Sequence, residues 1–408
     1  MTKQKALELY IHIPFCVKKC NYCDFLSVPA GADVRRSYVD SLLEEIRRQG
    51  IFCRNDQVLS VFIGGGTPSL LAGVQILEIM EAVQESFPLK KDAEITLECN
   101  PGTLTGEKLS FYRSAGVNRL SLGLQSVDDR QLHRLGRIHT YKDFLESFDL
   151  ARKKGFSNIN VDLMSALPGQ TPVDWAYTLK KVTELQPEHI SAYSLIVEEG
   201  TPFYEQYGED ELRRERGEPP LVLPTEEDER EMYDMTREIL ESRGYFRYEI
   251  SNYALPGREC RHNIGYWTLT PYLGLGLGSS SFLENVRFSN TKDLDAYLSG
   301  EFANLPDILS GAFEPEGEQT DWKEKLDVSY LDKRQQMEEF MFLGLRMMEG
   351  ISRDRFEETF GVTIESVYGH VLQKLWRQGL LRLQENRVSL TEPGIAVSNY
   401  VFCEFLEA

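Results

Sequence analysis

The chain has 408 residues, a length that predicts two or three domains rather than one compact core. Its formal net charge of -19 argues against a nucleic-acid partner, and no stretch approaches the run of about 20 apolar residues that would span a bilayer. Seven cysteines, an odd number, and the polar start MTKQKALE predict a protein of a reducing compartment, most simply the cytoplasm.

The first half of the chain alternates short apolar strands with amphipathic helices. Strands are expected over 7–13, 58–66, 93–101, 117–126, 157–169 and 189–201. Helices are expected over 37–50, 70–87, 104–116, 141–155 and 175–186. Six such units in series predict an α/β fold built on a parallel, partial (β/α)6 barrel, in which functional residues collect at the carboxyl ends of the strands.

The last third of the chain is expected to fold as its own unit. An acidic, loop-like connector covers 301–322. Beyond it the pattern predicts helices over 332–350, 353–361 and 363–381, a hairpin over 381–390 and a closing helix over 392–406. Helices followed by a small hairpin indicate a mainly helical, winged-helix-like domain, and its modest basicity favours a lid or docking role over DNA binding. We therefore expect three domains, over 1–240, 241–310 and 311–408.

Three of the seven cysteines lie within eight residues of HIPFCVKKCNYCDF, as Cys16, Cys20 and Cys23. Three thiolates from one short loop can bind three irons of a cubane [4Fe-4S] cluster and leave the fourth iron open to a ligand. A zinc site with His12 as the fourth ligand is the alternative, although structural zinc sites usually pair their cysteines as two separated knuckles. The polar residues between the cysteines disfavour three unrelated core thiols.

Other polar and glycine-rich features follow the expected strands at the same edge. The GGGTP run after the second strand would let backbone approach a ligand closely and would offer free amides there. It lacks the GxGxxG spacing of a dinucleotide fold and is a weak signal by itself. Further along the chain, TPYLGLGLGSSSF is expected to be a Gly/Ser-rich loop after a short strand, in close contact with the barrel mouth.

These motifs together resemble one branch of the radical S-adenosylmethionine (SAM) superfamily, which contains oxygen-independent coproporphyrinogen oxidase and the heme chaperones of the HemW type. The resemblance runs through YIHIPFCxxxCxxCDF, GGGTP, ECNPGT, SLGLQS, LGRIH and DLMSALPGQT. It implies that the three cysteines bind a [4Fe-4S] cluster and that the methionyl group of SAM chelates the fourth iron. It further implies a SAM site lined by Tyr10, Gly65, Gly66, Thr67 and Glu98. Gln125, Arg137 and Asp162 would either complete this site or hold a second nucleotide.

Some of these residues also have a simpler structural interpretation. Without the cysteine motif, Glu98 and Asp162 would be interpreted as strand-end carboxylates that cap helices. Arg137 would be interpreted as a surface charge, as most arginines are.

Two features of the resemblance favour the HemW type over the oxidase. The oxidase motif continues with a fourth cysteine, CxxxCxxCxC, where this chain has Phe25. Downstream, CRHNIGYW matches the HNxxYW motif, which implies heme binding by His262, Asn263, Tyr266 and Trp267. An imidazole can ligate heme iron and aromatic rings can stack on the macrocycle. From the residues alone, a hydrogen-bonded histidine beside a packed Tyr–Trp pair is favoured instead, and Cys260 is interpreted as a bystander.

Two functions follow from the resemblance. The preferred one is a heme chaperone that binds heme and a SAM-coordinated [4Fe-4S] cluster and delivers heme to client hemoproteins such as respiratory enzymes. The alternative is a radical SAM oxidase that acts on coproporphyrinogen III or another tetrapyrrole, for which no catalytic residue is assigned. Cleavage of SAM, a cluster-dependent homodimer and peripheral membrane contact stay open, although the chain shows no basic amphipathic anchor.

Overall fold

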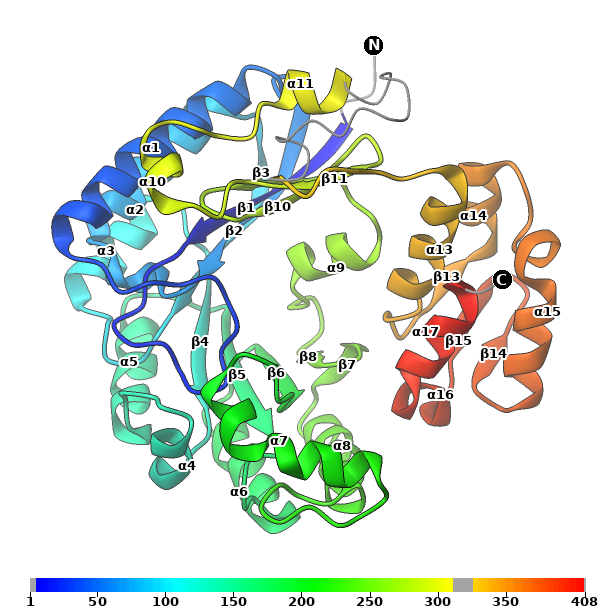
Figure 1. Ribbon diagram of the computed structural model, residues 1–408. Helices are drawn as coiled ribbons and strands as arrows, with labels where there is room; N and C mark the ends of the chain where they lie inside the picture. Colours follow the sequence, from blue (N-terminus) through cyan, green and yellow to red (C-terminus); the bar gives the residue numbers. More distant parts are fainter. Residues whose placement is uncertain (1–4, 311–325, 407–408) are drawn as a thin grey trace.

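The fold is built on one curved sheet of twelve strands, in a computed structural model that describes residues 5–310 and 326–406. Six parallel strands follow one another in chain order through its centre and curve into an open barrel (Figure 1). They are β1 (Lys5–Ile13), β2 (Asp56–Gly65), β3 (Leu89–Cys99), β4 (Arg119–Gln125), β5 (Ile159–Ser165) and β6 (His189–Ser194). The predicted partial (β/α)6 barrel is confirmed.

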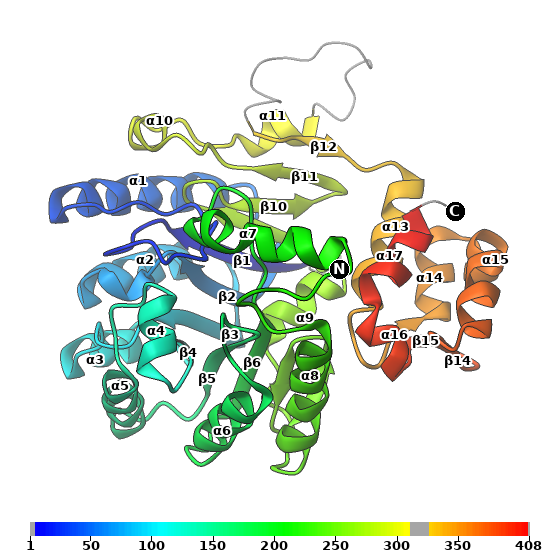
Figure 2. The ribbon, with the colours of Figure 1, turned by 60° about the horizontal axis from the view of Figure 1, so that its bottom comes forward.

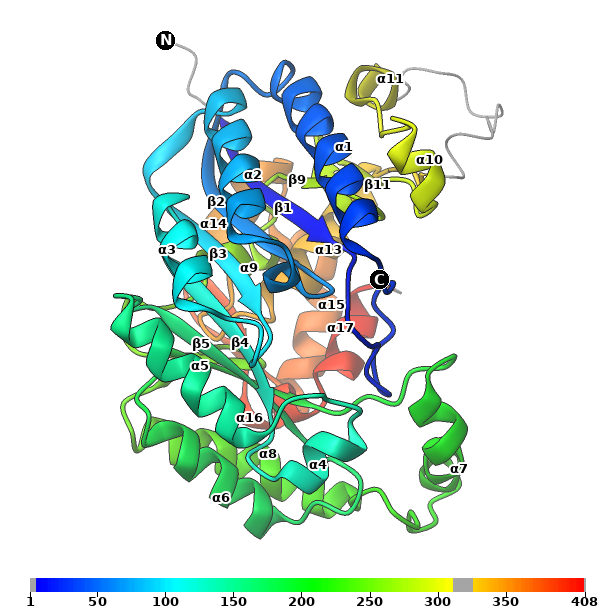
Figure 3. The same cartoon turned by 90° about the vertical axis from the view of Figure 1, so that its left-hand side faces the viewer.

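Helices cover the convex, outer face of this sheet (Figure 3). They are α1 (Ala32–Gly50), α2 (Gly73–Ser86), α3 (Gly106–Ser114), α5 (Tyr141–Lys153) and α6 (Pro172–Thr183). Capping boxes begin two of them, with Thr140 and Asp143 at α5 and Thr171 and Asp174 at α6. Their apolar sides pack on the strands in one continuous core. Two short helices, η1 (Pro68–Leu70) and α4 (Asp129–Arg134), lie within the loops of the rim.

Short strands extend the sheet at both edges, those beyond β1 visible in Figure 2 and those beyond β6 in Figure 1. Beside β6 lie β8 (Asn252–Ala254) and β7 (Phe246–Glu249), and beside β1 lie β9 (Tyr272–Leu275), β10 (Ser280–Leu283), β11 (Val286–Ser289) and β12 (Ser329–Tyr330). The expected Gly/Ser-rich loop is therefore two strands and a turn, because the open edge of β1 supplies hydrogen-bond partners that no local pattern reveals. Its contact with the barrel mouth is present, since a Cβ at Gly276 would stand 2.6 Å from the His12 carbonyl oxygen.

The remaining helices of residues 5–310 connect these strands. They are α7 (Pro202–Glu215), α8 (Glu226–Glu241), α9 (Arg261–Trp267), α10 (Leu294–Leu298) and α11 (Leu305–Ser310). Helix α9 lies on the concave side of the sheet, between the barrel and the C-terminal domain (Figure 1). No helix in the two described ranges is long and apolar enough to cross a bilayer.

The C-terminal domain is mainly helical and has its own hydrophobic core, as expected. It contains α13 (Lys333–Gly344), α14 (Arg353–Phe360), α15 (Ile364–Arg377), α16 (Glu392–Ala396) and α17 (Ser398–Leu406). A small sheet of β13 (Ile351–Ser352), β15 (Arg387–Leu390) and β14 (Leu381–Leu383) forms the wing. The single closing helix expected over 392–406 is two helices, because Val397 leaves the helical conformation between them.

We propose that the chain divides into units 1–240, 241–310 and 311–408. The last unit is supported by its separate core, whereas residues 241–310 pack into the core of the barrel. The boundary at 310 and most of the expected connector fall on residues 311–325, outside the described residues.

Candidate functional site

The loop that carries the three cysteines crosses the mouth of the barrel from the end of β1 (Figure 1). Its base is closed by two hydrogen bonds, in which Cys16 N–H donates to the Val28 carbonyl (3.2 Å) and Val28 N–H donates to the Pro14 carbonyl (2.8 Å). Its tip is fixed on the far side, where Asn21 N–H donates to the carbonyl of Leu135 after α4 (2.9 Å). Backbone hydrogen bonds therefore hold the loop at its base and at its tip, independently of its thiols.

Polar side chains from three other segments of the rim surround this loop: Thr67 follows β2, Asn100 follows β3 and Arg137 follows α4. The Thr67 hydroxyl lies 3.5 Å from Cys16 Sγ, and Arg137 Nη1 donates to Cys20 Sγ at 3.6 Å. Arg137 Nη2 also donates to the Gly123 carbonyl (2.6 Å) and to Asn100 Oδ1 (2.9 Å). The Arg137 guanidinium thus points into the rim of the barrel, in contrast to the surface charge that its residue type alone suggests. Hydrogen-bond donors that face sulfur stabilise thiolate ligands.

The arrangement of these thiols fits an iron–sulfur cluster better than a zinc ion. All three cysteines are half-buried and free of disulfides. Within residues 5–310 and 326–406, no three His, Cys, Asp or Glu side chains gather closely enough to hold one metal ion. His12 is also engaged elsewhere, since its ring nitrogens are hydrogen bonded to the Tyr10 hydroxyl and the Leu26 carbonyl, both at 3.0 Å. In a cubane each thiolate binds a different iron, so its sulfurs stand farther apart than the donors to one ion.

The glycine run supports the cysteine loop instead of offering free amides, so the expectation of free amides was wrong. Gly66 N–H donates to the Ile13 carbonyl (2.9 Å), and Thr67 N–H donates to the Phe15 carbonyl (2.7 Å). Gly65 N–H donates to Glu98 Oε2 (3.1 Å). The parallel register of β1 and β2 carries this backbone onto the segment before Cys16. A Cβ at Gly66 would stand 2.8 Å from the Phe15 carbonyl oxygen, which explains the glycine by close backbone approach.

Two buried carboxyl groups lie on the same rim. Burial, with a smaller contribution from the charge of Asp162, raises the pKa of Glu98 to about 8. Burial also raises the pKa of Asp162, whose oxygens accept hydrogen bonds from Ser121 (3.0 Å) and Asn160 (2.7 Å). Glu98 is therefore protonated at neutral pH, and a bound cation would favour its ionised form. Gln125 ends β4 with a φ of 70° and places its side-chain amide beside Gly123.

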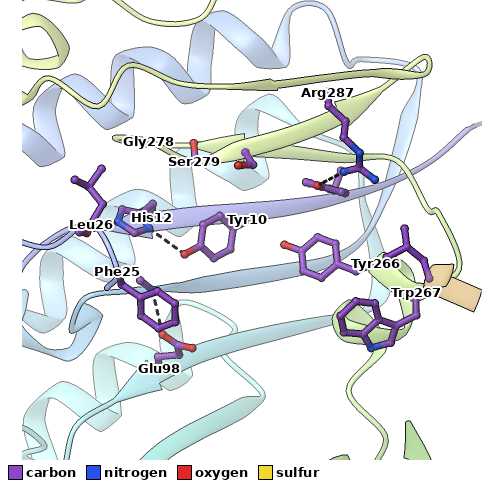
Figure 4. Close-up of a pocket in the computed structure, with 14 residues that line it drawn as sticks. Tyr10, His12, Phe25, Leu26, Glu98, Tyr266, Trp267, Gly278, Ser279 and Arg287 are labelled. Carbon is purple, nitrogen blue, oxygen red and sulfur yellow. Dashed lines mark hydrogen bonds between the residues drawn. The ribbon is translucent and has the colours of Figure 1, made fainter. Parts of the chain in front are cut away.

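One cavity of about 510 Å³ joins the two sets of predicted site residues (Figure 4). From the expected SAM site it contains Tyr10, Gly65 and Glu98, and from the HNxxYW motif it contains Tyr266 and Trp267. The cavity is also lined by His12, Phe25, Leu26, Tyr272, Gly278, Ser279, Ser280, Arg287 and Leu343. Tyr272, Gly278, Ser279 and Ser280 belong to the Gly/Ser-rich run that was expected to contact the barrel mouth. Arg287 on β11 and Leu343 on α13 belong to no motif and reach the cavity only through the fold.

The HNxxYW motif presents its aromatic rings to the cavity and its histidine to the protein interior. His262 is 1% exposed, and its ring nitrogens are hydrogen bonded to the Ser60 hydroxyl (2.8 Å) and the Tyr266 hydroxyl (2.9 Å). Burial, with the charge of Arg119, lowers the pKa of His262 to about 3, so its imidazole is neutral. Asn263 is half-buried and does not line the cavity, and Cys260 is fully buried.

A buried carboxyl group beneath the motif makes stability depend on pH. Glu8 is 2% exposed, and its Oε2 has no hydrogen-bond partner among the described residues and lies 3.8 Å from His262 Nδ1. Burial raises the pKa of this group to about 9. The folded state then keeps a proton on Glu8, whereas the unfolded state loses this proton above the ordinary glutamate pKa of 4.5. The free energy of unfolding therefore falls as pH rises toward 9. In the wild type, the free energy of unfolding should fall by up to about 1.4 kcal/mol per pH unit, and we expect Glu8→Gln to remove this slope.

Thermal or denaturant unfolding between pH 5 and 9 measures this slope. The exposed Glu107→Gln on α3 is the matched control, which should follow the wild type at every pH. Parallel curves for wild type and Glu8→Gln would contradict the assignment of a protonated Glu8.

Comparison with known proteins agrees with this geometry. The model of the radical SAM superfamily matches residues 10–182, and that of the HemN C-terminal domain matches residues 331–397. The solved structure of coproporphyrinogen III oxidase from Escherichia coli, titled a radical SAM enzyme, has a TM-score of 0.79 at 23% identity, over 98% of this chain and 90% of that one, which shows a shared fold.

Two relatives match over nearly their whole length. The heme chaperone HemW of Lactococcus lactis subsp. lactis is 36% identical over 403 residues, 99% of this chain and 98% of that protein. The heme chaperone HemW of Bacillus subtilis is 35% identical over 398 residues, 97% of this chain and 98% of that protein. With the cysteine loop, the shared cavity and the HNxxYW helix in place, the chain belongs to the HemW family of radical SAM proteins.

Proposed function

We propose that this protein is a heme chaperone that carries a SAM-bound [4Fe-4S] cluster, binds heme in the cavity of about 510 Å³ and delivers it to client hemoproteins. The observation that carries the proposal is that this cavity brings the aromatic residues of the HNxxYW motif next to residues of the expected SAM site. The relatives named heme chaperones, which match along the whole chain, support it.

In this proposal Cys16, Cys20 and Cys23 hold the cluster, which supplies a low-potential redox centre with one iron open to SAM. The SAM site comprises Tyr10, Gly65, Gly66, Thr67, Glu98, Gln125, Arg137 and Asp162. Glu98 is suited to the ammonium group of SAM, because its proton can leave when a cation binds. Gly66 and Thr67 act through their backbone, which keeps the cysteine loop against β2.

Heme lies against Tyr266 and Trp267, whose rings can stack on the macrocycle. His262 supports this wall from the protein side, where it positions the Tyr266 hydroxyl through their hydrogen bond. Asn263 follows His262 on α9 and does not line the cavity. We place the protein in the cytoplasm, with clients such as respiratory enzymes. The proposal also includes a homodimer that depends on the cluster and peripheral contact of the protein with a membrane.

The test is an anaerobic titration. The cluster is reconstituted, heme is added while absorbance is recorded, and the same sample is assayed for 5'-deoxyadenosine and for decarboxylation of coproporphyrinogen III. We expect stoichiometric heme binding without decarboxylation. Decarboxylation with release of the nucleoside and no specific heme binding would establish the oxidase instead.

A further inference from the structure

Arg287 is a cationic residue of the cavity wall that belongs to no motif. It lies on β11 and, in Figure 4, on the same side of the cavity as Tyr266 and Trp267. Among the described residues that line the cavity, it is the only arginine or lysine. Its side chain is 31% exposed, so the guanidinium is partly desolvated and still accessible. A charge in this position needs either a protein partner or a ligand.

The guanidinium is fixed along one edge and open along the other. Its Nε and Nη2 donate to the two carboxylate oxygens of Glu339, at 2.7 and 2.6 Å, and Nη1 donates to the Tyr272 hydroxyl at 3.0 Å. The Phe282 ring packs below it, 4.7 Å from the guanidinium carbon. Within the described residues these bonds use three of its five N–H groups, which leaves one on each Nη for a further acceptor. Two such N–H groups match the two oxygens of a carboxylate.

The partner of Arg287 comes from the C-terminal domain. Glu339 lies on α13, and Leu343, one turn further along the same helix, lines the cavity directly. Just after that helix, Arg346 lies over the Trp267 ring at 4.2 Å. The C-terminal domain thus lines the cavity with Leu343 and contacts two other lining residues, Arg287 through Glu339 and Trp267 through Arg346. The ion pair between Arg287 and Glu339 connects this domain to the extended sheet.

We propose that Arg287 binds a carboxylate group of the tetrapyrrole in this cavity and that Glu339 is the positioning residue that aims its free edge. The inference rests on the proposed function, since it assumes a tetrapyrrole ligand. Heme carries an apolar macrocycle with carboxylate side chains, and the cavity offers aromatic rings beside one oriented guanidinium. The methionyl carboxylate of SAM has the same chemistry, so the test must separate the two sources.

The test compares heme that carries free carboxylates with heme dimethyl ester, titrated by absorbance into the full-length protein with its cluster. We expect wild type to prefer free heme and Arg287→Gln to bind it about tenfold more weakly or worse, because one charge-assisted contact is lost. The affinity for the dimethyl ester should not change. Arg287→Lys keeps the charge but loses the fork, so it should fall between the two. SAM affinity should be unchanged in both variants.

The exposed Arg258→Gln is the matched control and should bind like the wild type. A loss of equal size for both heme ligands would overturn the inference, because it would show a loosened C-terminal domain rather than a lost carboxylate contact. Tight and equal binding of both ligands by wild type and Arg287→Gln would also overturn it and leave the chaperone proposal intact. Weaker SAM binding alone would assign Arg287 to SAM. If wild type binds neither heme ligand, the proposed function itself fails.

Discussion

Serine in place of Cys16, Cys20 or Cys23 is expected to remove the visible iron–sulfur absorbance and nearly all bound iron. Each thiolate would hold its own iron, and a serine hydroxyl does not replace a thiolate in such a site. The fold should survive, because backbone hydrogen bonds at both ends hold the loop without the thiols. Absorbance and iron content after anaerobic reconstitution measure the first effect, and thermal unfolding of the unreconstituted proteins measures the second.

Cys403→Ser is the matched control for this series. Cys403 is an exposed, free cysteine on α17 of the C-terminal domain, far along the chain from the loop. It should reconstitute like the wild type. A full cluster in all three loop variants would end the assignment of the cluster to this loop.

His262→Ala is expected to lower the free energy of unfolding by about 2–4 kcal/mol. The change empties a fully buried site and leaves the hydroxyls of Ser60 and Tyr266 without their partner. Heme affinity should fall with it, because Tyr266 loses the bond that orients its ring on the cavity wall. The spectrum of the heme that does bind should stay as in the wild type, since the imidazole lies behind Tyr266 and not on the cavity. Denaturant unfolding and heme titration measure the two effects.

Tyr266→Phe separates positioning from iron ligation. It removes the hydroxyl that is hydrogen bonded to His262 but keeps the ring. It should therefore cause part of the same loss of heme affinity, with a smaller decrease in the free energy of unfolding. If His262 were the iron ligand, His262→Ala would shift the heme spectrum and Tyr266→Phe would leave both spectrum and affinity unchanged. That pair of results would contradict the positioning role.

The order of the barrel strands could be predicted because each unit carries its own local signal. Apolar runs such as LELYIHI and VLSVFIGG mark buried strands, and helical periodicity marks the segments between them. Parallel strands in series allow few topologies, so the polar residues after each strand were correctly placed on one rim. The short edge strands β9 to β12 carry too few residues for a pattern, and their partners lie far away in the chain.

The site residues could be predicted only where they form a motif of fixed spacing within one short segment. CxxxCxxC and HNxxYW named the cysteine loop and the helix α9 without any structure. The same patterns could not show that the amides of Gly66 and Thr67 are already bonded, or that His262 turns inward, because these facts depend on β1 and β2.

By itself, the sequence determined the barrel, through local periodicity, and the family, through a resemblance carried by closely spaced motifs that include the three cysteines of one loop. Only the tertiary structure decided that Tyr10, Glu98, Tyr266 and Arg287 share one cavity. The reason is that β9 and β11 join the barrel beside β1, and α13 then lies against them, which brings together residues that are hundreds of positions apart. Such contacts arise from packing between distant elements, and no local pattern in the chain encodes them.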